Sequence, residues 1–505
     1  MKNLLYTLWV LLLIASACKK TSASTASGIN APPVSASLPA NTSYYIDATG
    51  GNDSNNGTSP ATAWKTLTKV IMQQFSAGDK VLFKAGCTWA GNLVLSGSGT
   101  STAPIIVDMY GTGNKPVING DASTNGSVAV LLNNVSYWEV NNLEVTNTAP
   151  NSQNALTGIK INNSGSAATD HIYIKNCYVH DVTSTVYGTH NYVKGTGGII
   201  FTGFINDVLV QGCHVANCQI EGIRTSSSTQ ASNVVFDHNF IENIYGDGIV
   251  FNGVTGNSKI TNNVVHNACI TNDANFAGIW TYNSYQTTIA YNEVYGLTGG
   301  YIDGEAFDAD ISAYGDIFEY NYSHDNAGGF MLFMPDAQNI IVRYNISAND
   351  VSGGVKLFNY TATGASNQIY NNTFYINNNV TNIFETNFVG TFANNIIVSQ
   401  GTVTSFSQKP MSSAARFINN CIYPNNVILA TNWTGCYHTG DIFANPQFVN
   451  SASFGVGSAS ATGFALQNNS PCIQAGTPIP GNGGYDFFNK TLSATNPPDV
   501  GAVMH

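Results

Sequence analysis

The chain has 505 residues, of which only 9% are charged, and it carries a net charge of −11 with a pI near 5.1. No run of Lys and Arg follows Lys19 and Lys20, so the footprint for nucleic-acid phosphates is missing and we expect no nucleic-acid partner. With 49 Gly, 43% hydrophobic and 11% aromatic residues, the composition excludes a disordered chain. It favours a turn-rich, all-β fold with an extensive core.

The N-terminus has the pattern of an export signal. Lys2 precedes an apolar run from Leu4 to Ile14, and small residues lead to Cys18. Segment 1–18 is too short for a stable membrane span and resembles a bacterial lipoprotein signal, which implies lipidation at Cys18; ordinary cleavage is the alternative. Residues 19–43, rich in Ser, Thr, Ala and Pro, predict a flexible tether. We expect an exported protein, anchored by lipid alone to the outer membrane or cell surface, or else periplasmic or secreted.

From Val140 onward the chain repeats one phrase, an apolar strand start, then Asn, then an apolar strand end. The phrases centre on Asn142, Asn176, Gly212, Asn239, Asn263, Asn292, Asn321, Asn345, Asn372, Asn395 and Asn420. From position 212 the spacings are 27, 24, 29, 29, 24, 27, 23 and 25 residues. This period, with β-branched residues and no helical pattern, predicts a β-solenoid of about ten or more coils, with one coil per repeat. Asn tolerates left-handed backbone and can bond to the Asn one coil on, which predicts an internal Asn ladder.

A second phrase, Gly followed by an alternating strand, recurs between the Asn positions. Because side chains alternate across a strand, one set should point into the coil and their successors outward. The expected inward residues are Ile223, Ile249, Ile279, Phe307, Phe330 and Val355. The expected outward row is Arg224, Val250, Trp280, Asp308, Met331 and Lys356.

The two ends of this domain carry a family resemblance. The opening contains the segments Tyr44-Tyr-Ile-Asp-Ala-Thr-Gly-Gly-Asn-Asp and Ala77-Gly-Asp-Lys-Val. The ending contains the segments Asn445-Pro-Gln-Phe-Val and Pro498-Asp-Val-Gly-Ala. They resemble the cap, first coil and closing segment of the pectate-lyase-like superfamily. The resemblance implies a right-handed parallel β-helix that forms a single domain over residues 44–503. One fold hosts many chemistries, so the activity must be inferred from the site.

Four acids stand out within residues 301–310: Asp303, Glu305, Asp308 and Asp310. Asp310 follows Asp308 by two residues, so the two should share a face about 6.6 Å apart. Paired carboxyl groups can act as acid and as nucleophile or base, with gaps of about 5–5.5 Å for retention and about 6.5–9.5 Å for inversion. Repulsion between them raises one pKa and keeps that group protonated. We therefore predict a site that cleaves glycosidic bonds of a polysaccharide or oligosaccharide.

Neighbouring residues extend this predicted site. Trp280 and Tyr282 offer faces for sugar stacking, and Arg224 and Lys356 offer charges for uronate or sulfate groups. Asp303 and Glu305 lie at the entering turn, where they could join the catalysis or bind calcium. His324, beside Asp325 in the next turn, is a candidate proton relay or substrate contact.

Three functions remain open from the sequence. A glycoside hydrolase would use the carboxylates and need no cofactor. A polysaccharide lyase would use Lys356 or Arg224 as the base and the acidic cluster for calcium. A non-catalytic surface protein would only bind glycans. Asp310 stands where the resemblance to one pectate-lyase family calls for Lys, which favours the hydrolase.

Eight cysteines follow Cys18, and none forms a CxxC pair. Export permits disulfides, and Cys421 with Cys436 is the best candidate. Cys177, Cys213 and Cys269 lie in strand-like stretches, where we expect small buried thiols. We expect a monomer.

Overall fold

The computed structural model describes residues 41–185, 193–227, 231–271, 275–299, 303–364, 366–424, 435–493 and 495–505. The expected signal 1–18 with its Cys18, and residues 19–40 of the expected tether, lie outside these ranges. Within them, no helix has both the length and the apolar character needed to cross a membrane.

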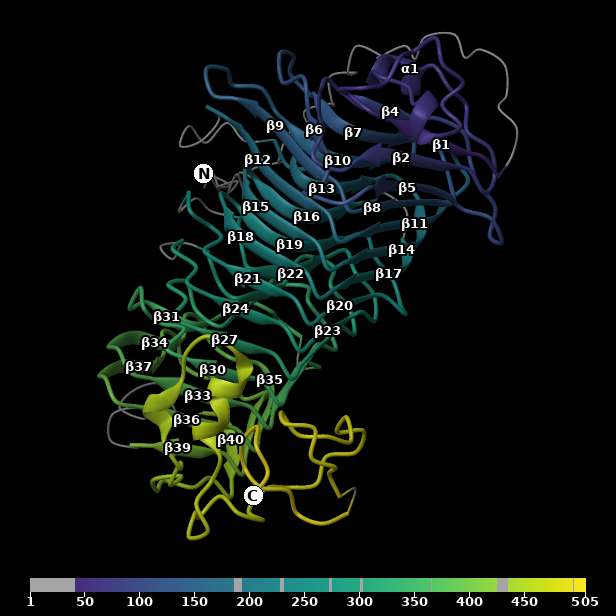
Figure 1. Cartoon of the computed structure of the whole chain (residues 1–505). Coiled ribbons are helices and arrows are strands. Elements are labelled where there is room, and N and C mark those ends of the chain that lie inside the picture. The colour runs from purple at the N-terminus through teal and green to yellow at the C-terminus, as the bar shows by residue number, and fades with distance from the viewer. Residues whose placement is uncertain are drawn as a thin grey trace, which may run out of the picture. The chain divides into compact units, whose positions relative to one another are not determined.

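Three parallel β-sheets contain nearly all of the described secondary structure (Figure 1). From β2 to β37 the chain passes in turn through a strand of the first, the second and the third sheet. Each strand pairs in parallel with its counterpart one coil on. The described part of the chain is thus a parallel β-helix, in agreement with the predicted fold class.

Among the described residues the first sheet contains 15 strands: β1 (Ser43–Ile46), β2 (Lys80–Lys84), β5 (Ile105–Tyr110), β8 (Trp138–Asn141), β11 (Thr169–Lys175), β14 (Ile205–Gln211), β17 (Ser232–Asp237), β20 (Lys259–Thr261), β23 (Thr288–Ala290), β26 (Ile317–Glu319), β29 (Ile341–Arg343), β32 (Gln368–Tyr370), β35 (Gly390–Ala393), β38 (Ala415–Ile418) and β40 (Tyr437–Thr439). The second contains 13: β3 (Thr88–Ala90), β6 (Val117–Asn119), β9 (Glu144–Ala149), β12 (Tyr178–Ser184), β15 (His214–Cys218), β18 (Phe240–Ile244), β21 (Val264–His266), β24 (Glu293–Tyr295), β27 (Tyr322–His324), β30 (Ile346–Ala348), β33 (Thr373–Ile376), β36 (Ile396–Ser399) and β39 (Cys421–Tyr423).

The third sheet, which carries the acidic residues, contains 12 strands in the described ranges: β4 (Leu93–Leu95), β7 (Val128–Asn133), β10 (Thr157–Asn162), β13 (Gly197–Thr202), β16 (Glu221–Ser226), β19 (Asp247–Asn252), β22 (Ile279–Tyr282), β25 (Phe307–Ala309), β28 (Met331–Phe333), β31 (Lys356–Tyr360), β34 (Val380–Phe384) and β37 (Val403–Ser407). The described helical segments are short: α1 (Leu67–Ile71) and the 3-10 segments η1 (Pro60–Thr62), η2 (Ser451–Ser453) and η3 (Ser458–Phe464).

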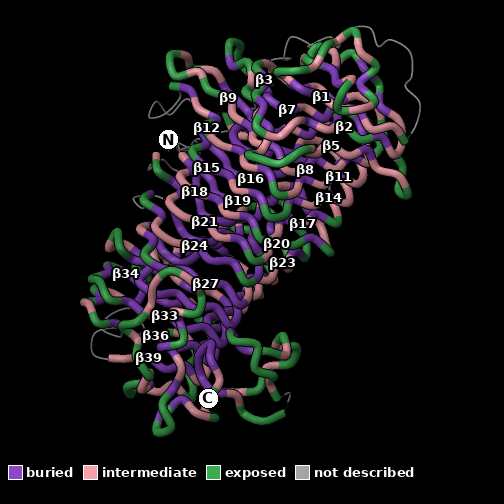
Figure 2. Tube along the Cα trace, viewed as in Figure 1, coloured by how far each residue is buried: buried purple, intermediate pink, exposed green. Residues whose placement is uncertain are grey.

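The core runs inside the coils, where the inward residues of each strand lie beside their counterparts one coil on. Figure 2 shows buried positions along the strands of every sheet. In the third sheet Ile223 pairs with Ile249, Ile249 with Ile279, and Ile279 with Phe307, and all four are fully buried. This confirms the predicted inward register over these coils. Each coil therefore buries its apolar face mainly against its two neighbours.

Asn side chains join successive coils at the turn between the first and second sheets. From Asn239 to Asn420, each Nδ2 donates to the Oδ1 of the Asn one coil on, at 2.9 to 3.2 Å. The Asn420 amide donates in turn to Asp441 at 3.1 Å. These bonds satisfy buried amides that would otherwise lose their water partners.

The first three positions of the predicted row lie one residue out of register. Asn142, Asn176 and Gly212 themselves adopt the left-handed turn, with φ of 57°, 55° and 63°. The inward place after two of them is taken by the buried Cys177 and Cys213, and the N–H of Cys213 donates to Asn239 Oδ1. The sequence alone does not reveal this shift, because Asn occurs both at the left-handed turn position and at the inward ladder position that follows it.

The cysteines differ in part from expectation. Cys177, Cys213 and Cys269 are buried, as predicted. The expected disulfide between Cys421 and Cys436 is not formed: the Cys421 thiol donates to the Ala444 carbonyl at 3.3 Å. The spacing of cysteines along the chain did not predict this contact with Ala444, which directly precedes the closing segment.

Candidate active site

The predicted outward row exists on four neighbouring strands of the third sheet. Arg224 on β16 pairs with Val250 on β19, Val250 with Trp280 on β22, and Trp280 with Asp308 on β25. Asp310 follows β25 directly, and its N–H donates to the Thr281 carbonyl. The strand register thus brings Asp308, Asp310 and the Trp280 strand together as predicted.

Beyond β25 the predicted row is wrong by one residue. Asp308 pairs with Leu332, and Met331 points into the core beside Phe330. The cause lies in the preceding turn, where Gly329 has φ of 122° and the strand begins later than its phrase suggests. A single-residue shift in a strand exchanges its two faces.

The next coil departs further from the prediction. Leu332 pairs with Asn359, whereas Lys356 pairs with Asn382. The expected inward residue Val355 is only half-buried, and Leu357 and Phe358 fill the core instead. Lys356 therefore reaches the acidic residues from the start of β31 rather than from the paired row.

Two of the four acids are buried and two are partly exposed. Asp308 is 6% exposed and Glu305 is fully buried, whereas Asp303 and Asp310 are half-buried. Burial, reinforced by the neighbouring Asp310 and Glu305 carboxylates, raises the pKa of Asp308 well above its usual range. Burial also raises the pKa of Asp310, and the Asp303 carboxylate adds to this effect. The acids thus act on one another, and Asp303 lies close enough to Asp310 to raise its pKa.

A buried lysine faces the acidic turn. The Nζ of Lys356 lies 3.3 Å from Glu305 Oε1 and 3.6 Å from Glu385 Oε2, and the side chains of Lys356 and Glu305 are fully buried. Burial raises the pKa of Glu305 to about 7 even though Lys356 opposes the shift. This buried position against Glu305 does not favour Lys356 as a base that contacts substrate, and the lyase role of Lys356 stays a prediction.

The same contact bears on the calcium prediction for Asp303 and Glu305. Among the described residues, no group of three or more His, Cys, Asp or Glu side chains converges on one point. Glu305 already faces the Lys356 ammonium, and Asp303 accepts a hydrogen bond from the Asn275 N–H. The two carboxylates therefore face different partners, and calcium binding here stays a prediction.

Trp280 is enclosed by cations. It is 7% exposed, with Lys194 Nζ 5.3 Å and Arg224 Cζ 5.4 Å from the ring centroid. Tyr282 is half-exposed and meets Trp280 edge to face at 6.4 Å. Little of the Trp280 face is open to a sugar, so Tyr282 is the better stacking candidate.

Sequence reasoning missed three charged residues beside this row. Glu221 and Asp247 pair with each other at the starts of β16 and β19. Arg224 contacts Glu221 at 2.6 Å, and Lys194 contacts Asp247 at 2.6 Å. A signal for the acids was present, because Glu221, Asp247 and Glu305 each directly precede the Gly- or Ala-led strand phrase. No such signal was present for Lys194, because its contact with Asp247 joins residues far apart in the chain.

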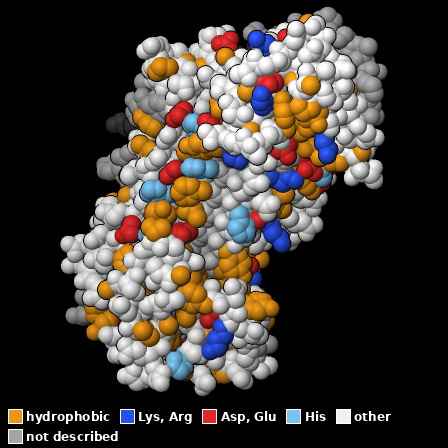
Figure 3. Space-filling model, viewed as in Figure 1, with side chains coloured by type: hydrophobic (Ala, Val, Ile, Leu, Met, Phe, Trp, Pro, Cys, Tyr) orange, Lys and Arg blue, Asp and Glu red, His pale blue; other side chains and the backbone are white. Residues whose placement is uncertain are grey.

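His324 lies apart from the acids, on β27 of the second sheet. It stacks on Tyr295 and on Tyr322, each at 4.8 Å between centroids, and bonds Asp325 and Glu293. Histidines and aromatic residues recur on the outer face of this sheet. Several histidines are visible in pale blue on the face shown in Figure 3. The structure therefore does not bring His324 to the predicted site.

His324 should make stability depend on pH. Burial by itself lowers its pKa, but the bonds to Asp325 and Glu293 outweigh this and raise the pKa to about 9. Because this lies above the usual value of about 6.5, the stabilisation is complete below about pH 6.5 and is lost as pH rises through about 9. Between about pH 6.5 and about pH 9, we expect the melting temperature of the wild-type protein to fall by more than that of the His324→Gln variant. A His324→Gln profile parallel to the wild-type one would contradict the assignment, and the exposed His438→Gln serves as control.

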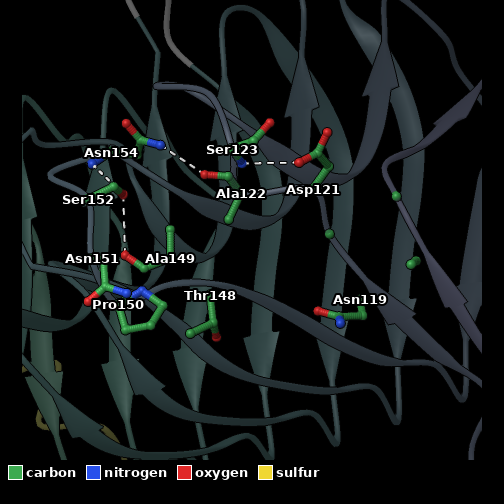
Figure 4. Close-up of a pocket in the computed structure, with 13 residues that line it drawn as sticks. Asn119, Asp121, Ala122, Ser123, Thr148, Ala149, Pro150, Asn151, Ser152 and Asn154 are labelled. Atoms are coloured by element: carbon green, nitrogen blue, oxygen red, sulfur yellow. Dashed lines mark hydrogen bonds between the residues drawn. The ribbon is translucent and has the colours of Figure 1, made fainter.

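A cavity of about 700 Å³ lies at the turns between the second and third sheets of the early coils (Figure 4). Its lining mixes apolar residues with uncharged polar ones, and its one charged residue among those described, Asp121, accepts from the Ser123 N–H at 3.1 Å. Between β10 and β25 the third sheet has four further strands, β13, β16, β19 and β22. At about 4.8 Å per strand the cavity lies roughly 24 Å or more from Asp308, so it is separate from the acidic residues.

The coil topology and the acidic turn define a right-handed parallel β-helix protein with a carboxylate-rich coil at β25. The family described as "Right handed beta helix region" matches residues 106–294. The chain is similar to the lacto-N-biosidase of Bifidobacterium longum subsp. longum, with 26% identity over 588 residues, covering 92% of this chain and 36% of that protein. It thus spans about a third of that relative.

Solved structures agree with the fold. A GH136 lacto-N-biosidase from Eubacterium ramulus has a TM-score of 0.58 at 23% identity, covering 75% of this chain and 67% of its own. A second structure of it has a TM-score of 0.56 at 26% identity, covering 66% and 64%. XylC with xylose has a TM-score of 0.53 at 10% identity, covering 92% and 98%.

Proposed function

We propose that this chain is a glycoside hydrolase that cleaves an oligosaccharide with the carboxyl groups of Asp303 and Asp310. The observation that carries the proposal is the gathering of four acids at one coil, two of them partly exposed. A catalytic carboxyl group must touch the sugar, and Asp303 and Asp310 are the partly exposed pair. The 26% identity to a lacto-N-biosidase supports the same reaction class.

The buried acids have a supporting role in this proposal. Asp308 lies between the pair in sequence and is shielded from water, and the Asp310 and Glu305 carboxylates add to the burial that raises its pKa. Glu305 and Lys356 form a buried ion pair beneath the turn that holds Asp303. One exposed carboxyl group gives a proton to the departing oxygen, and the other attacks the sugar carbon or activates water.

The expected substrate is a neutral oligosaccharide that carries a lacto-N-biose unit, the unit in the name of the relatives. Arg224 and Lys356, the cations expected to bind uronate or sulfate, are both buried and paired with carboxylates. The half-exposed Tyr282 remains as a stacking surface beside Asp310. These features favour an uncharged sugar over an acidic one.

Purified protein should release lacto-N-biose from such an oligosaccharide and produce new reducing ends. Chelator should leave the rate unchanged if no calcium takes part. A product that absorbs in the ultraviolet would instead identify a lyase, because elimination leaves an unsaturated uronate. Binding of these glycans without any cleavage would support the non-catalytic alternative.

A further inference from the structure

Three consecutive coils place a tyrosine where the fold favours asparagine. The residue before each ladder Asn has a left-handed backbone, with φ of 59° at Tyr291, 56° at Tyr320 and 50° at Tyr344. In the flanking coils this position is Asn262, with φ of 54°, and Asn371, with φ of 52°. Bulky side chains rarely adopt this conformation, whereas Asn does so readily. The tyrosines therefore carry a backbone cost that their rings must offset.

The rings form a stack with one open end. Tyr291 stacks on Tyr320 at 5.0 Å and 20°, and Tyr320 on Tyr344 at 5.9 Å and 21°. The closing segment covers Tyr320 and Tyr344, which pack with Ile479 and Leu492. Tyr291 remains 40% exposed. Packing of the closing segment thus explains two of the tyrosines but leaves the ring of Tyr291 facing solvent.

A cavity of about 380 Å³ begins at this open end. Phe487 and Phe488 of the closing segment form the opposite side, meeting edge to face at 4.9 Å. The Tyr291 hydroxyl donates to Asn489 Oδ1 at 3.2 Å and so ties the two sides together. The size lies in the range of small-molecule sites.

The residues that line the cavity indicate which class of ligand it would bind. Aromatic faces stand beside the amides of Asn262 and Asn489 and the carboxylate of Glu293. None of the described residues that line the cavity is Lys or Arg. Aromatic faces take the apolar side of a sugar ring, amides and carboxylates bind hydroxyls, and the missing cations disfavour acidic sugars.

We propose that this cavity is a second carbohydrate-binding site, non-catalytic and specific for neutral sugars, with Tyr291 as its stacking platform. It lies at the turns between the first and second sheets, whereas Asp308 belongs to the third sheet. The site therefore goes beyond the proposed hydrolase and holds a glycan while another part of the molecule reacts.

Tyr291→Asn tests the platform without straining the turn, because Asn is the residue of the flanking coils. In full-length Asp310→Asn protein, which suppresses turnover, calorimetry with galactose, N-acetylglucosamine and lacto-N-biose should show binding of at least one of them and none of galacturonate. Adding Tyr291→Asn should weaken that binding at least about tenfold, while Tyr291→Phe retains it within a few-fold. The melting temperature of Tyr291→Asn should not fall.

Tyr285→Ala is the matched control, since Tyr285 is 41% exposed and stacks on Tyr314 at 5.3 Å. An equal loss with Tyr285→Ala, unchanged binding with Tyr291→Asn, or no binding of any of the three sugars would overturn the proposal. Failure of the proposed hydrolase looks different: Asp310→Asn alone would then retain full cleavage. Tyr291→Asn in the otherwise wild-type chain should leave kcat/KM on a short soluble substrate unchanged.

Discussion

Asp310→Asn should lower kcat/KM for oligosaccharide cleavage by about 1,000-fold, and Asp303→Asn by a similar factor. Each change removes a carboxyl group that can exchange a proton with, or attack, the substrate, and such groups contribute about 10²- to 10⁴-fold. Asn preserves the shape, so the Ile311 N–H that donates to Asp310 Oδ1 keeps an acceptor. Initial rates on the cleaved oligosaccharide, with circular dichroism as a folding check, measure the effect.

Asp336→Asn is the matched control for this test. Asp336 is an exposed acid one coil on, where it accepts bonds from the Ser312 N–H and hydroxyl at 3.1 Å. Its loss should leave the rate within about twofold, because surface pairs of this kind contribute little. A folded Asp310→Asn protein with full activity would move the reaction away from the coil of β25.

Lys356→Met should destabilise the fold by about 1 kcal/mol at pH 7 and by about 1.4 kcal/mol more for each pH unit above it, because Glu305 has a pKa of about 7 and is already partly protonated at neutral pH. Lys356 is the cation that faces the fully buried Glu305, and its removal leaves that carboxyl group without a compensating charge. Glu305 then has to take up a proton or open its turn to water. Denaturant unfolding followed by circular dichroism measures the change.

Two further variants separate charge from packing at this position. Adding Glu305→Gln to Lys356→Met should restore much of the lost stability, since a neutral pair replaces the unpaired acid. Lys409→Met, at an exposed position, should change stability by less than about 0.5 kcal/mol. No recovery in the double variant would show that Lys356 acts through packing alone.

The repeat predicted most of the fold because its two signals are local. Alternation placed Ile223, Ile249 and Ile279 in the core, and the spacing of Asn residues marked one turn of every coil. The prediction failed where a turn changed the register, as at Gly329, since one residue exchanges the faces of β28. Which residues of a strand point inward depends on the conformation of the preceding turn. The Gly-led phrase does not determine that conformation.

The site was predicted less completely, for a related reason. Asp308 and Asp310 follow from alternation along one strand, and the strand register confirmed their neighbours. Exposure does not follow from alternation: Arg224, Trp280 and Lys356 were expected to face substrate and are buried among opposite charges and rings. The partners that bury them, such as Lys194 and Glu385, come from loops and coils outside the predicted row.

The Asn ladder gives this protein a polarity that no single coil has. Every side-chain amide from Asn239 to Asn420 donates in the same direction along the chain, so their dipoles add up. The row ends on a carboxylate, Asp441, at the end toward which the N–H groups point. An anion there is matched to the row as an acid is matched to the N-terminus of a helix. The ladder therefore ends on a charged acceptor, whereas every earlier acceptor in it is a neutral amide. An Asn in place of Asp441 could continue the ladder but would lack the charge that matches its dipole.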